Sequence, residues 1–545
     1  MFRFFDIEAR NSGAQDSIRF VRELRAKAIS RNRDAAAVSM RSIDGRSLDL
    51  DDVIAVARQG EPVRLAPAAA KRVDASRRAL EKVVAKGALA YGIKTGFGEL
   101  ANVAISDADV RTLQLNLLRS HAIGQGQPLR RDEVRAAILL RANTLAMGYS
   151  GVRRVLVTRL LQFLNRGVHP VIPSRGSLGA SGDLAPLAHL GLVLVGEGGA
   201  EVGGRVLPGA KALAHAKLAP LVLQSKEGLA IINGTSVMAA VGALVVNDGL
   251  RLLKDAQVAA SMSFEALRGS PKPFDDRLVA LKPQPGAREV AANLRRLLRR
   301  SEIIPSHKGP HKVQDPYTLR CIPQVLGAVR AALDSAAASL RIEMNAATDN
   351  PLIFPEGTSV SGGNFHAQAL AMALDHVALG MAVLAGFSER RIARLVDTRL
   401  SELPPFLTRK SGLNSGMMIV QYVAAGYASD NKVLAHPASA DSIPTSANQE
   451  DFVPMGMSAA LKARQALENA AHVVALEVLA AAQGLEFLKP LRPGVGPRAA
   501  HEFVRSGVPP LVDDRSLAPD ANRILEWMAT GQLLKAVEGA AGRLA

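Results

Sequence analysis

The sequence contains one cysteine and one tryptophan, and aromatic residues make up only 4% of its 545 positions. A single cysteine excludes an internal disulfide and is typical of a reducing compartment, so we expect a cytoplasmic protein. The first residues lack the apolar core and the cleavage site of a secretory signal. Ala, Leu and Val dominate and strand-like alternation is scarce, which favours a mainly α-helical fold.

Acidic residues are the minority among the charges, with 50 Asp and Glu against 67 Lys and Arg. A net charge of +17 permits nucleic-acid binding. However, the basic residues are spread among acids in helix-like segments, without a stacked-aromatic or zinc-finger pattern. We therefore expect no nucleic-acid partner. We interpret the charge as a surface that attracts small anions or as a solvated face.

Long apolar segments predict the helices of a bundle. The longest uncharged run, between Glu227 and Asp248, contains Asn233 and several glycines, which indicates a buried helix and no membrane partner. A second apolar helix is predicted over 461–488. Between them, apolar residues alternate four and three positions apart, which is typical of a bundle seam: Leu370, Leu374, Val377, Met381 and Leu384.

One stretch, 176–189, reads GSLGASGDLAPLAH and can carry unusual chemistry. Because Gly182 has no Cβ, its backbone nitrogen can approach the carbonyl carbon of Ala180. Attack by that nitrogen and loss of two waters, the second from the Ser181 hydroxyl, would give a 4-methylideneimidazole-5-one (MIO), a strong electrophile. The alternative is a turn of small residues, since Ala-Ser-Gly alone is expected in roughly one chain in several of this length.

Three further motifs offer acid–base and anion-binding groups. The glycine-rich string YGIKTGFGEL (91–100) predicts a mobile loop, in which Tyr91 is either an anchor or a general base. His121 lies among apolar residues, where a histidine is usually a satisfied core group. Arg320, in VQDPYTLRC (313–321), is either paired with Asp315 or a two-pronged clamp for a substrate carboxylate.

These motifs, in this order, resemble those of the histidine and aromatic amino-acid ammonia-lyases over roughly residues 46–530. The resemblance implies a long central helical bundle of the aspartase/fumarase-like superfamily with a smaller, loop-rich N-terminal part. It also implies a homotetramer whose sites are shared between subunits. We predict an N-terminal extension (1–45), an N-terminal part with the Tyr and MIO loops (46–240), the bundle (241–490) and a C-terminal tail (491–545).

The resemblance also implies the roles of individual residues. Tyr91 would be the general base, Arg320 the carboxylate clamp, and the MIO the only cofactor, with no metal. The implied catalytic set is Tyr91, Ala180, Ser181, Gly182, Asn233, Tyr317, Arg320 and Glu450. The implied substrate-binding set is Ser120, His121, Gln314, Arg320, Phe365 and Met418.

The pairing Ser120-His121 is the one that histidine lyases show, and Glu450 would join it in binding the imidazole. The expected reaction is therefore elimination of ammonia from L-histidine to give trans-urocanate. Two departures from the family pattern, Lys94 and Phe452, keep alternatives open. These are a tyrosine or phenylalanine ammonia-lyase and an MIO-dependent 2,3-aminomutase.

Overall fold

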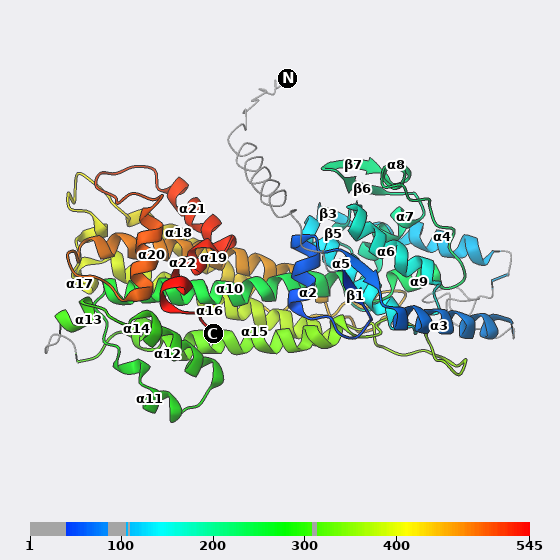
Figure 1. The fold of residues 1–545 in the computed structure, drawn as a ribbon, viewed down its shortest axis with the longest axis horizontal. Coiled ribbons are helices and arrows are strands. Elements are labelled where there is room, and N and C mark those ends of the chain that lie inside the picture. The colour runs from blue at the N-terminus through cyan, green and yellow to red at the C-terminus, as the bar shows by residue number, and fades with distance from the viewer. Residues whose placement is uncertain (1–39, 86–104, 107–108, 308–312) are drawn as a thin grey trace, which may run out of the picture.

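The computed structural model describes residues 40–85, 105–106, 109–307 and 313–545. Long helices run side by side along its long axis, and shorter helices gather at both ends (Figure 1). The expected mainly α-helical class is thus confirmed. The helices of eight residues or more are α3 (Pro67–Ala85), α4 (Val110–His121), α5 (Arg131–Ala146), α6 (Arg154–Arg166), α7 (Leu184–Leu194), α10 (Ser236–Ala266), α12 (Pro285–Leu297), α15 (Ile322–Met344), α16 (Gln368–Val396), α18 (Met418–Leu434), α19 (Gly456–Glu486), α20 (Val495–Arg505), α21 (Ala518–Ala529) and α22 (Gln532–Ala541).

Short helices and strands connect these elements. The short helices are α2 (Leu50–Ile54), the π-helical turn η1 (Ala55–Gln59), α8 (Gly209–His215), α9 (Glu227–Ile232), η3 (Lys272–Phe274), α11 (Asp276–Ala280), α13 (Ile303–Ser306), α14 (Tyr317–Arg320), α17 (Thr398–Ser401) and η4 (Pro405–Leu407). The strands are β1 (Arg41–Ile43), β2 (Val63–Leu65), β3 (Gln125–Pro128), β4 (His169–Pro170), β5 (Pro173–Arg175), β6 (Gly199–Val202), β7 (Arg205–Pro208), β8 (Leu352–Ile353) and β9 (Ser359–Val360).

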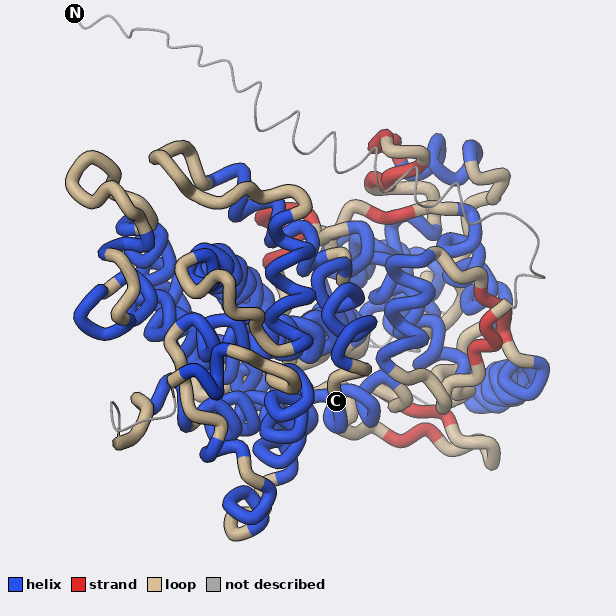
Figure 2. Tube along the Cα trace, turned by 60° about the vertical axis from the view of Figure 1, so that its left-hand side comes forward, coloured by secondary structure: helices blue, strands red, loops and turns tan. Residues whose placement is uncertain are grey.

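Within the described ranges, the strands form four small sheets: parallel β1-β2 and antiparallel β3-β5, β4-β6-β7 and β8-β9. Figure 2 shows how short the strands are beside the helices. The strands labelled in Figure 1 (β1, β3, β5, β6 and β7) lie on the side of the molecule that carries the N-terminal helices. The predicted loop-rich N-terminal part lies on this side.

The bundle is built on α10, α15, α16 and α19. The predicted seam of α16 is confirmed, because each of its five apolar residues is at most 1% exposed. The second predicted helix is α19, which begins at Gly456, five residues earlier than expected. The buried apolar residues continue toward the N-terminus through Ala459 and Ala460, which are too small to indicate a helix start.

Helices α10 and α16 are long and apolar enough to cross a membrane, but both belong to the core. Their most apolar windows are 78% and 56% buried inside the protein. The uncharged run noted in the sequence forms α9 and the first half of α10, as expected for a buried segment.

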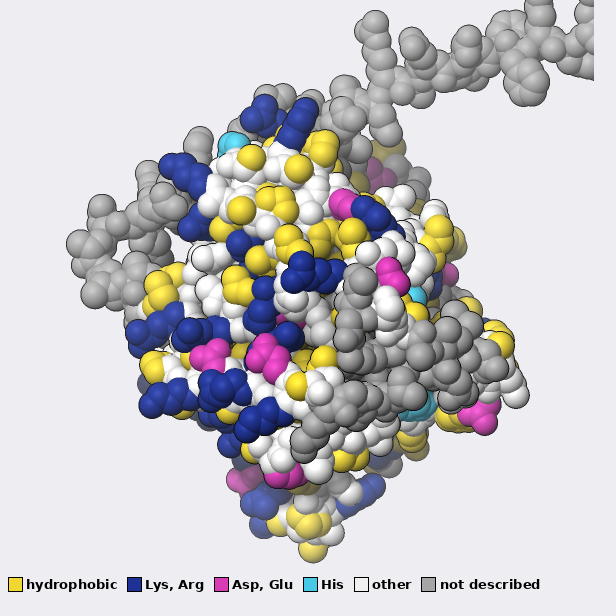
Figure 3. All heavy atoms as spheres, turned by 90° about the vertical axis from the view of Figure 1, so that its right-hand side faces the viewer, with side chains coloured by type: hydrophobic (Ala, Val, Ile, Leu, Met, Phe, Trp, Pro, Cys, Tyr) yellow, Lys and Arg dark blue, Asp and Glu magenta, His cyan; other side chains and the backbone are white. Residues whose placement is uncertain are grey.

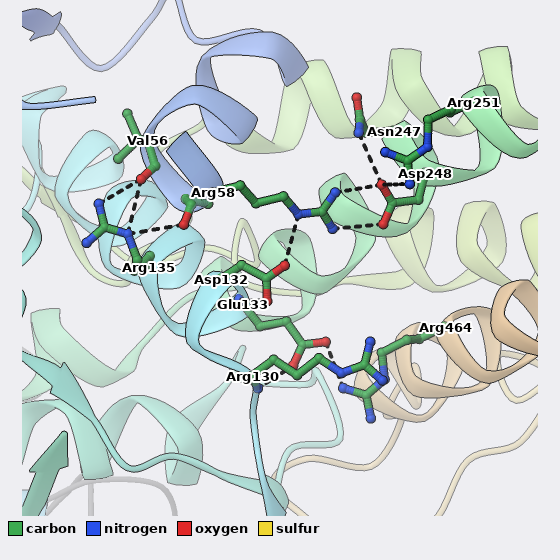
Figure 4. A network of polar contacts seen from close by, with 11 residues as sticks. Val56, Arg58, Arg130, Asp132, Glu133, Arg135, Asn247, Asp248, Arg251 and Arg464 are labelled. Atoms are coloured by element: carbon green, nitrogen blue, oxygen red, sulfur yellow. Dashed lines mark hydrogen bonds and ion pairs between the residues drawn. The ribbon is translucent and has the colours of Figure 1, made fainter. Parts of the chain in front are cut away.

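Ion pairs join the N-terminal part to the bundle (Figure 4). Arg58 of η1 donates to Asp132 of α5 at 2.9 Å and to Asp248 of α10 at 2.6 and 2.8 Å. Arg464 of α19 donates to Glu133 of α5 at 2.7 Å. These contacts fix α5 against the two longest helices, so the loops at that end are held by the bundle.

Candidate active site

The tripeptide Ala180-Ser181-Gly182 lies in the loop between β5 and α7. Gly182 has φ +76°, a left-handed conformation that favours glycine. A Cβ at this position would lie 2.3 Å from the carbonyl carbon and oxygen of Gly234 and 2.4 Å from its nitrogen. The loop therefore packs directly on the backbone between α9 and α10, and only glycine fits at 182.

Asp183 ties this loop to the first turn of α10. Its N–H donates to the carbonyl oxygen of Gly234 at 2.8 Å. Its carboxylate accepts from the N–H groups of Val237 and Met238, at 2.7 and 3.0 Å, and from the Ser177 hydroxyl at 2.8 Å. Burial raises the pKa of this carboxyl to about 6, and these donors oppose the rise. The sequence prediction left Asp183 out of the site, although it follows the tripeptide directly.

Glu450 reaches the tripeptide from far along the sequence. The Ser181 hydroxyl donates to Glu450 Oε1, and the Thr445 hydroxyl donates to Oε2 at 2.7 Å. The backbones of Thr445 and Glu450 also pair, with the Thr445 N–H 2.9 Å from the Glu450 carbonyl oxygen. Farther along the segment, the Gly456 N–H donates to the Leu178 carbonyl at 3.1 Å. The Glu450 carboxylate is therefore held by Thr445 of its own segment and bonded to Ser181 of the loop.

His121, the last residue of α4, belongs to the same group. The Ser120 hydroxyl donates to the Leu117 carbonyl at 3.2 Å, and its oxygen lies 3.0 Å from Nδ1 of His121. That oxygen can accept from Nδ1–H, which leaves Nε2 available to a ligand. Burial lowers the pKa of His121, and the charge of Glu450 acts in the opposite direction. The imidazole is thus mainly neutral at pH 7 and interacts electrostatically with Glu450.

Two more predicted residues lie beside the loop. Asn233 ends α9 directly before Gly234 and is 4% exposed, and its Oδ1 has no hydrogen-bond partner among the described residues. Phe365 is half-buried and lies two residues before Ala367, whose N–H donates to the Gly179 carbonyl at 3.1 Å. The chain therefore brings Ser120, His121, Asn233, Phe365 and Glu450 to the tripeptide.

Four other predicted residues belong to the opposite end of the bundle, where Figure 1 labels α14 and α18. Tyr317 and Arg320 are the ends of α14, Gln314 comes shortly before it, and α18 begins at Met418. The Asp315 carboxylate accepts from the Ser270 N–H at 2.6 Å, just beyond the end of α10. The 31 residues of α10 span about 46 Å, and the loop with Ser181 contacts the other end of this helix. One chain alone therefore does not bring these four residues to the tripeptide.

Arg320 lies close to Asp315 in the sequence but is not paired with it. No ion pair joins Asp315 and Arg320, both of which are described; the Asp315 carboxylate accepts from the Ser270 backbone N–H instead. Within the described residues, Arg320 forms no ion pair and its Nε has no hydrogen-bond partner. Its guanidinium lies 4.5 Å from the centre of the Tyr317 ring, which is 68% exposed.

Tyr91 and Lys94 lie outside the described residues. No group of three or more His, Cys, Asp or Glu side chains is placed to hold a metal in the described part of the chain. The basic side chains at the end with the N-terminal helices are spread over its face (Figure 3). Several of them are paired with acids, as in Arg119–Glu197 and Arg131–Glu201. This favours the interpretation as a solvated face.

Known proteins match this chain over most of its length. The model of the aromatic amino acid lyase family matches residues 48–506. The chain belongs to this family. A histidine ammonia-lyase from Gloeobacter violaceus is 53% identical over 504 residues, which is 92% of this chain and 98% of that one. The predicted family and the predicted enzyme class, a carbon–nitrogen lyase, are therefore confirmed.

Solved structures of this family share the fold. The crystal structure of a histidine ammonia-lyase from Trypanosoma cruzi matches with a TM-score of 0.86 and 39% identity, covering 92% of this chain and 96% of that one. A tyrosine aminomutase from Streptomyces globisporus matches with a TM-score of 0.89 and 36% identity, covering 93% and 100%. The predicted bundle architecture is confirmed.

Proposed function

We propose that this lyase eliminates ammonia from L-histidine to give trans-urocanate, with an MIO formed from Ala180, Ser181 and Gly182. The observation that carries the proposal is the group formed by Ser181, Glu450 and His121, which unites the tripeptide with two polar side chains suited to an imidazole. The 53% identity to a histidine ammonia-lyase supports the same substrate.

The residues around the tripeptide fit an MIO. The space that a Cβ would need at position 182 is filled by Gly234, so the Gly182 backbone is held without a side chain. The serine hydroxyl that must leave is held by Glu450, and the following Asp183 anchors the loop to α10. An MIO at this position would supply an electrophile for the substrate amine, which would make the amine nitrogen a better leaving group.

His121 and Glu450 would bind the imidazole of the substrate. A neutral His121 offers Nε2 as an acceptor, and Glu450 is an acceptor held by Thr445. An imidazolium side chain would donate to both groups, and a neutral imidazole would donate its one N–H to one of them. A phenyl ring would leave both groups without a partner, which is costly in a buried site. These two residues would therefore favour histidine over phenylalanine.

The remaining groups would come from other copies of the chain. Arg320 forms no ion pair with the described residues and could offer its planar guanidinium to the substrate carboxylate, with Tyr317 beside it. Both belong to α14, at the far end of their own bundle (Figure 1). Apolar side chains are exposed along α16 (Met372, Leu379 and Val383) and α18 (Ile419, Tyr422 and Val423). Exposed apolar stripes of this kind favour association. We propose a cytoplasmic homotetramer in which Gln314, Tyr317, Arg320 and Met418 of neighbouring subunits complete each site.

Tyr91 is our candidate for the general base that removes the β-proton. A phenol with an ordinary pKa near 10 is largely protonated at pH 7, so the site must favour its phenolate. Replacing Tyr91 by Phe should abolish turnover. The variant should still show the loss of two waters that marks MIO formation, because Tyr91 acts on the substrate.

A substrate panel tests the reaction. The purified protein is incubated separately with L-histidine, L-tyrosine and L-phenylalanine, and the products are identified. We expect urocanate and ammonia from histidine. A β-amino acid would instead indicate an aminomutase, the activity for which the similar Streptomyces globisporus structure is named. Cinnamate or coumarate as the main product would contradict the choice of histidine.

Mixed oligomers test the shared site. Ser181→Ala subunits lack the electrophile, and Arg320→Ala subunits lack the clamp, so each variant alone should be inactive. If sites combine residues from different subunits, co-expression of the two should restore part of the activity. No recovery in oligomers proven to be mixed would contradict the proposal that Arg320 serves a neighbouring subunit.

A further inference from the structure

Arg141, in the middle of α5, is a buried charge that the reaction does not use directly. Its side chain is 0% exposed, and its Nη1 donates to the carbonyl oxygen of Asn233 at 2.8 Å. Its Nε and Nη2 have no hydrogen-bond partner among the described residues. Burying a guanidinium with two unpaired donor nitrogens lowers the stability of the fold. We therefore expect a role of Arg141 other than packing.

The surroundings of Arg141 keep it charged and in place. Burial lowers its pKa to about 10, and the carboxylates of Asp349 and Asp183 oppose that change, so it remains a cation at pH 7. Asp349 is itself paired with the fully buried Lys226 at 2.6 Å. Because all of these side chains are buried within one chain, the arrangement does not depend on how subunits associate.

The guanidinium lies directly behind the backbone on which the tripeptide packs. A Cβ on Gly234 would lie 2.3 Å from Nη1 of Arg141 and 2.6 Å from the Thr348 hydroxyl. On its other side, Gly234 contacts Gly182, and its carbonyl oxygen accepts from the Asp183 N–H. The Asn233–Gly234 backbone is therefore held between Arg141 and the tripeptide.

We propose that Arg141 is a positioning residue for ring closure: by holding the Asn233–Gly234 backbone, it keeps Gly182 pressed toward Ala180. The inference rests on the proposed MIO. In that reaction a bond forms between the Gly182 nitrogen and the Ala180 carbonyl carbon. The Ala180 oxygen leaves as water with the amide protons of Ser181 and Gly182. The Ser181 hydroxyl then leaves as a second water with the Cα hydrogen, and no oxidant is needed.

The alternative is that Arg141 only stabilises the fold, and Arg135 provides the matched comparison. Arg135 lies on the same helix and is also buried. It donates to the carbonyl oxygen of Val56 (Figure 4) and to those of Ala57 and Leu164. None of these three carbonyls belongs to the loop or to the backbone behind it. An effect on folding alone should therefore appear equally in variants of both arginines.

The experiment follows ring formation by intact-protein mass. Arg141→Lys, Arg141→Met and Arg135→Lys are expressed in parallel with the unaltered protein, and samples are taken over time after synthesis. We expect the fraction of chains that have lost two waters to rise about tenfold more slowly in both Arg141 variants, the factor that the loss of one charge-assisted hydrogen bond corresponds to. Arg135→Lys should follow the unaltered protein. Activity per matured chain should change little in Arg141→Lys.

Each outcome bears on a different claim. A full mass in the unaltered protein would contradict the MIO itself, whatever the variants do. Folded Arg141 variants that lose two waters as fast as the unaltered protein would overturn the role of Arg141 and leave the MIO intact. Failure of both Arg141 variants to fold, with Arg135→Lys folded, would also overturn it, because Arg141 would then be a requirement of the fold.

Discussion

Replacing Gly182 by Ala tests how tightly the tripeptide is held. The new Cβ would lie 2.3 Å from two atoms of Gly234, whereas ordinary contacts are 3.4–4 Å. The two backbones must therefore separate by roughly 1 Å, a change comparable to overpacking, which typically costs about 1–3 kcal/mol. The left-handed conformation adds about 1–2 kcal/mol for a residue with a Cβ.

A second glycine separates these two contributions. Gly204, in the turn between β6 and β7, has φ +82° but nothing within 4 Å of its Cβ position. Gly204→Ala should therefore cost only the conformational part, about 1–2 kcal/mol. Gly182→Ala should cost roughly twice as much or more, and should also weaken the bond from the Asp183 N–H to Gly234.

Two measurements on each variant decide the matter: the free energy of unfolding and the intact mass. We expect Gly204→Ala to keep the loss of two waters and Gly182→Ala to lack it. If Gly182→Ala were as stable as Gly204→Ala and equally dehydrated, close packing against Gly234 would play no part in ring formation.

Three further predictions concern the substrate and pH. Arg320→Lys keeps the charge but loses the planar fork, so kcat/KM for histidine should fall roughly a hundredfold, the equivalent of about 3 kcal/mol; an unchanged value would remove Arg320 from the site. His121→Phe should lower the ratio of histidine to phenylalanine kcat/KM by about tenfold or more, whereas an unchanged ratio with a lower Tm would make His121 a core residue. Burial raises the pKa of the Asp255 carboxyl to about 8, above its ordinary value of 3.8. Between these two pH values the folded protein keeps a proton on Asp255 that the unfolded chain has lost. The free energy of unfolding of the unaltered protein therefore falls as the pH rises from about 4 to 8. Asp255→Asn should therefore gain stability relative to wild type between pH 5 and pH 8, on the order of a few kcal/mol in chemical denaturation; a difference independent of pH would contradict the assigned pKa.

The bundle could be predicted from the sequence because the apolar pattern of a helix depends only on residues close together in the chain. The apolar spacing along α16 follows directly from helical geometry, and all five predicted seam residues are buried. The motif strings likewise identified the family that the comparisons confirm. The division of the chain into four segments and the catalytic roles stay predictions.

The contacts of the site depend on tertiary structure and could not be predicted in the same way. Nothing local indicates that Glu450 reaches Ser181 or that Arg141 lies behind Gly234. One signal for Arg141 was present, since it is a charged residue within the apolar run AAILLRANTLA. A charge on an otherwise apolar helix face indicates a buried cation with a specific partner. For Arg320, a single chain does not give the contact either, because we propose that Arg320 completes the site of a neighbouring subunit.

The intact mass of the purified, unaltered protein tests whether Ala180, Ser181 and Gly182 form an electrophile. We expect a mass lower by two waters than the sequence requires, with the loss confined to a peptide that contains these three residues and absent from Ser181→Ala. A protein of full mass that still converts histidine to urocanate would contradict this expectation.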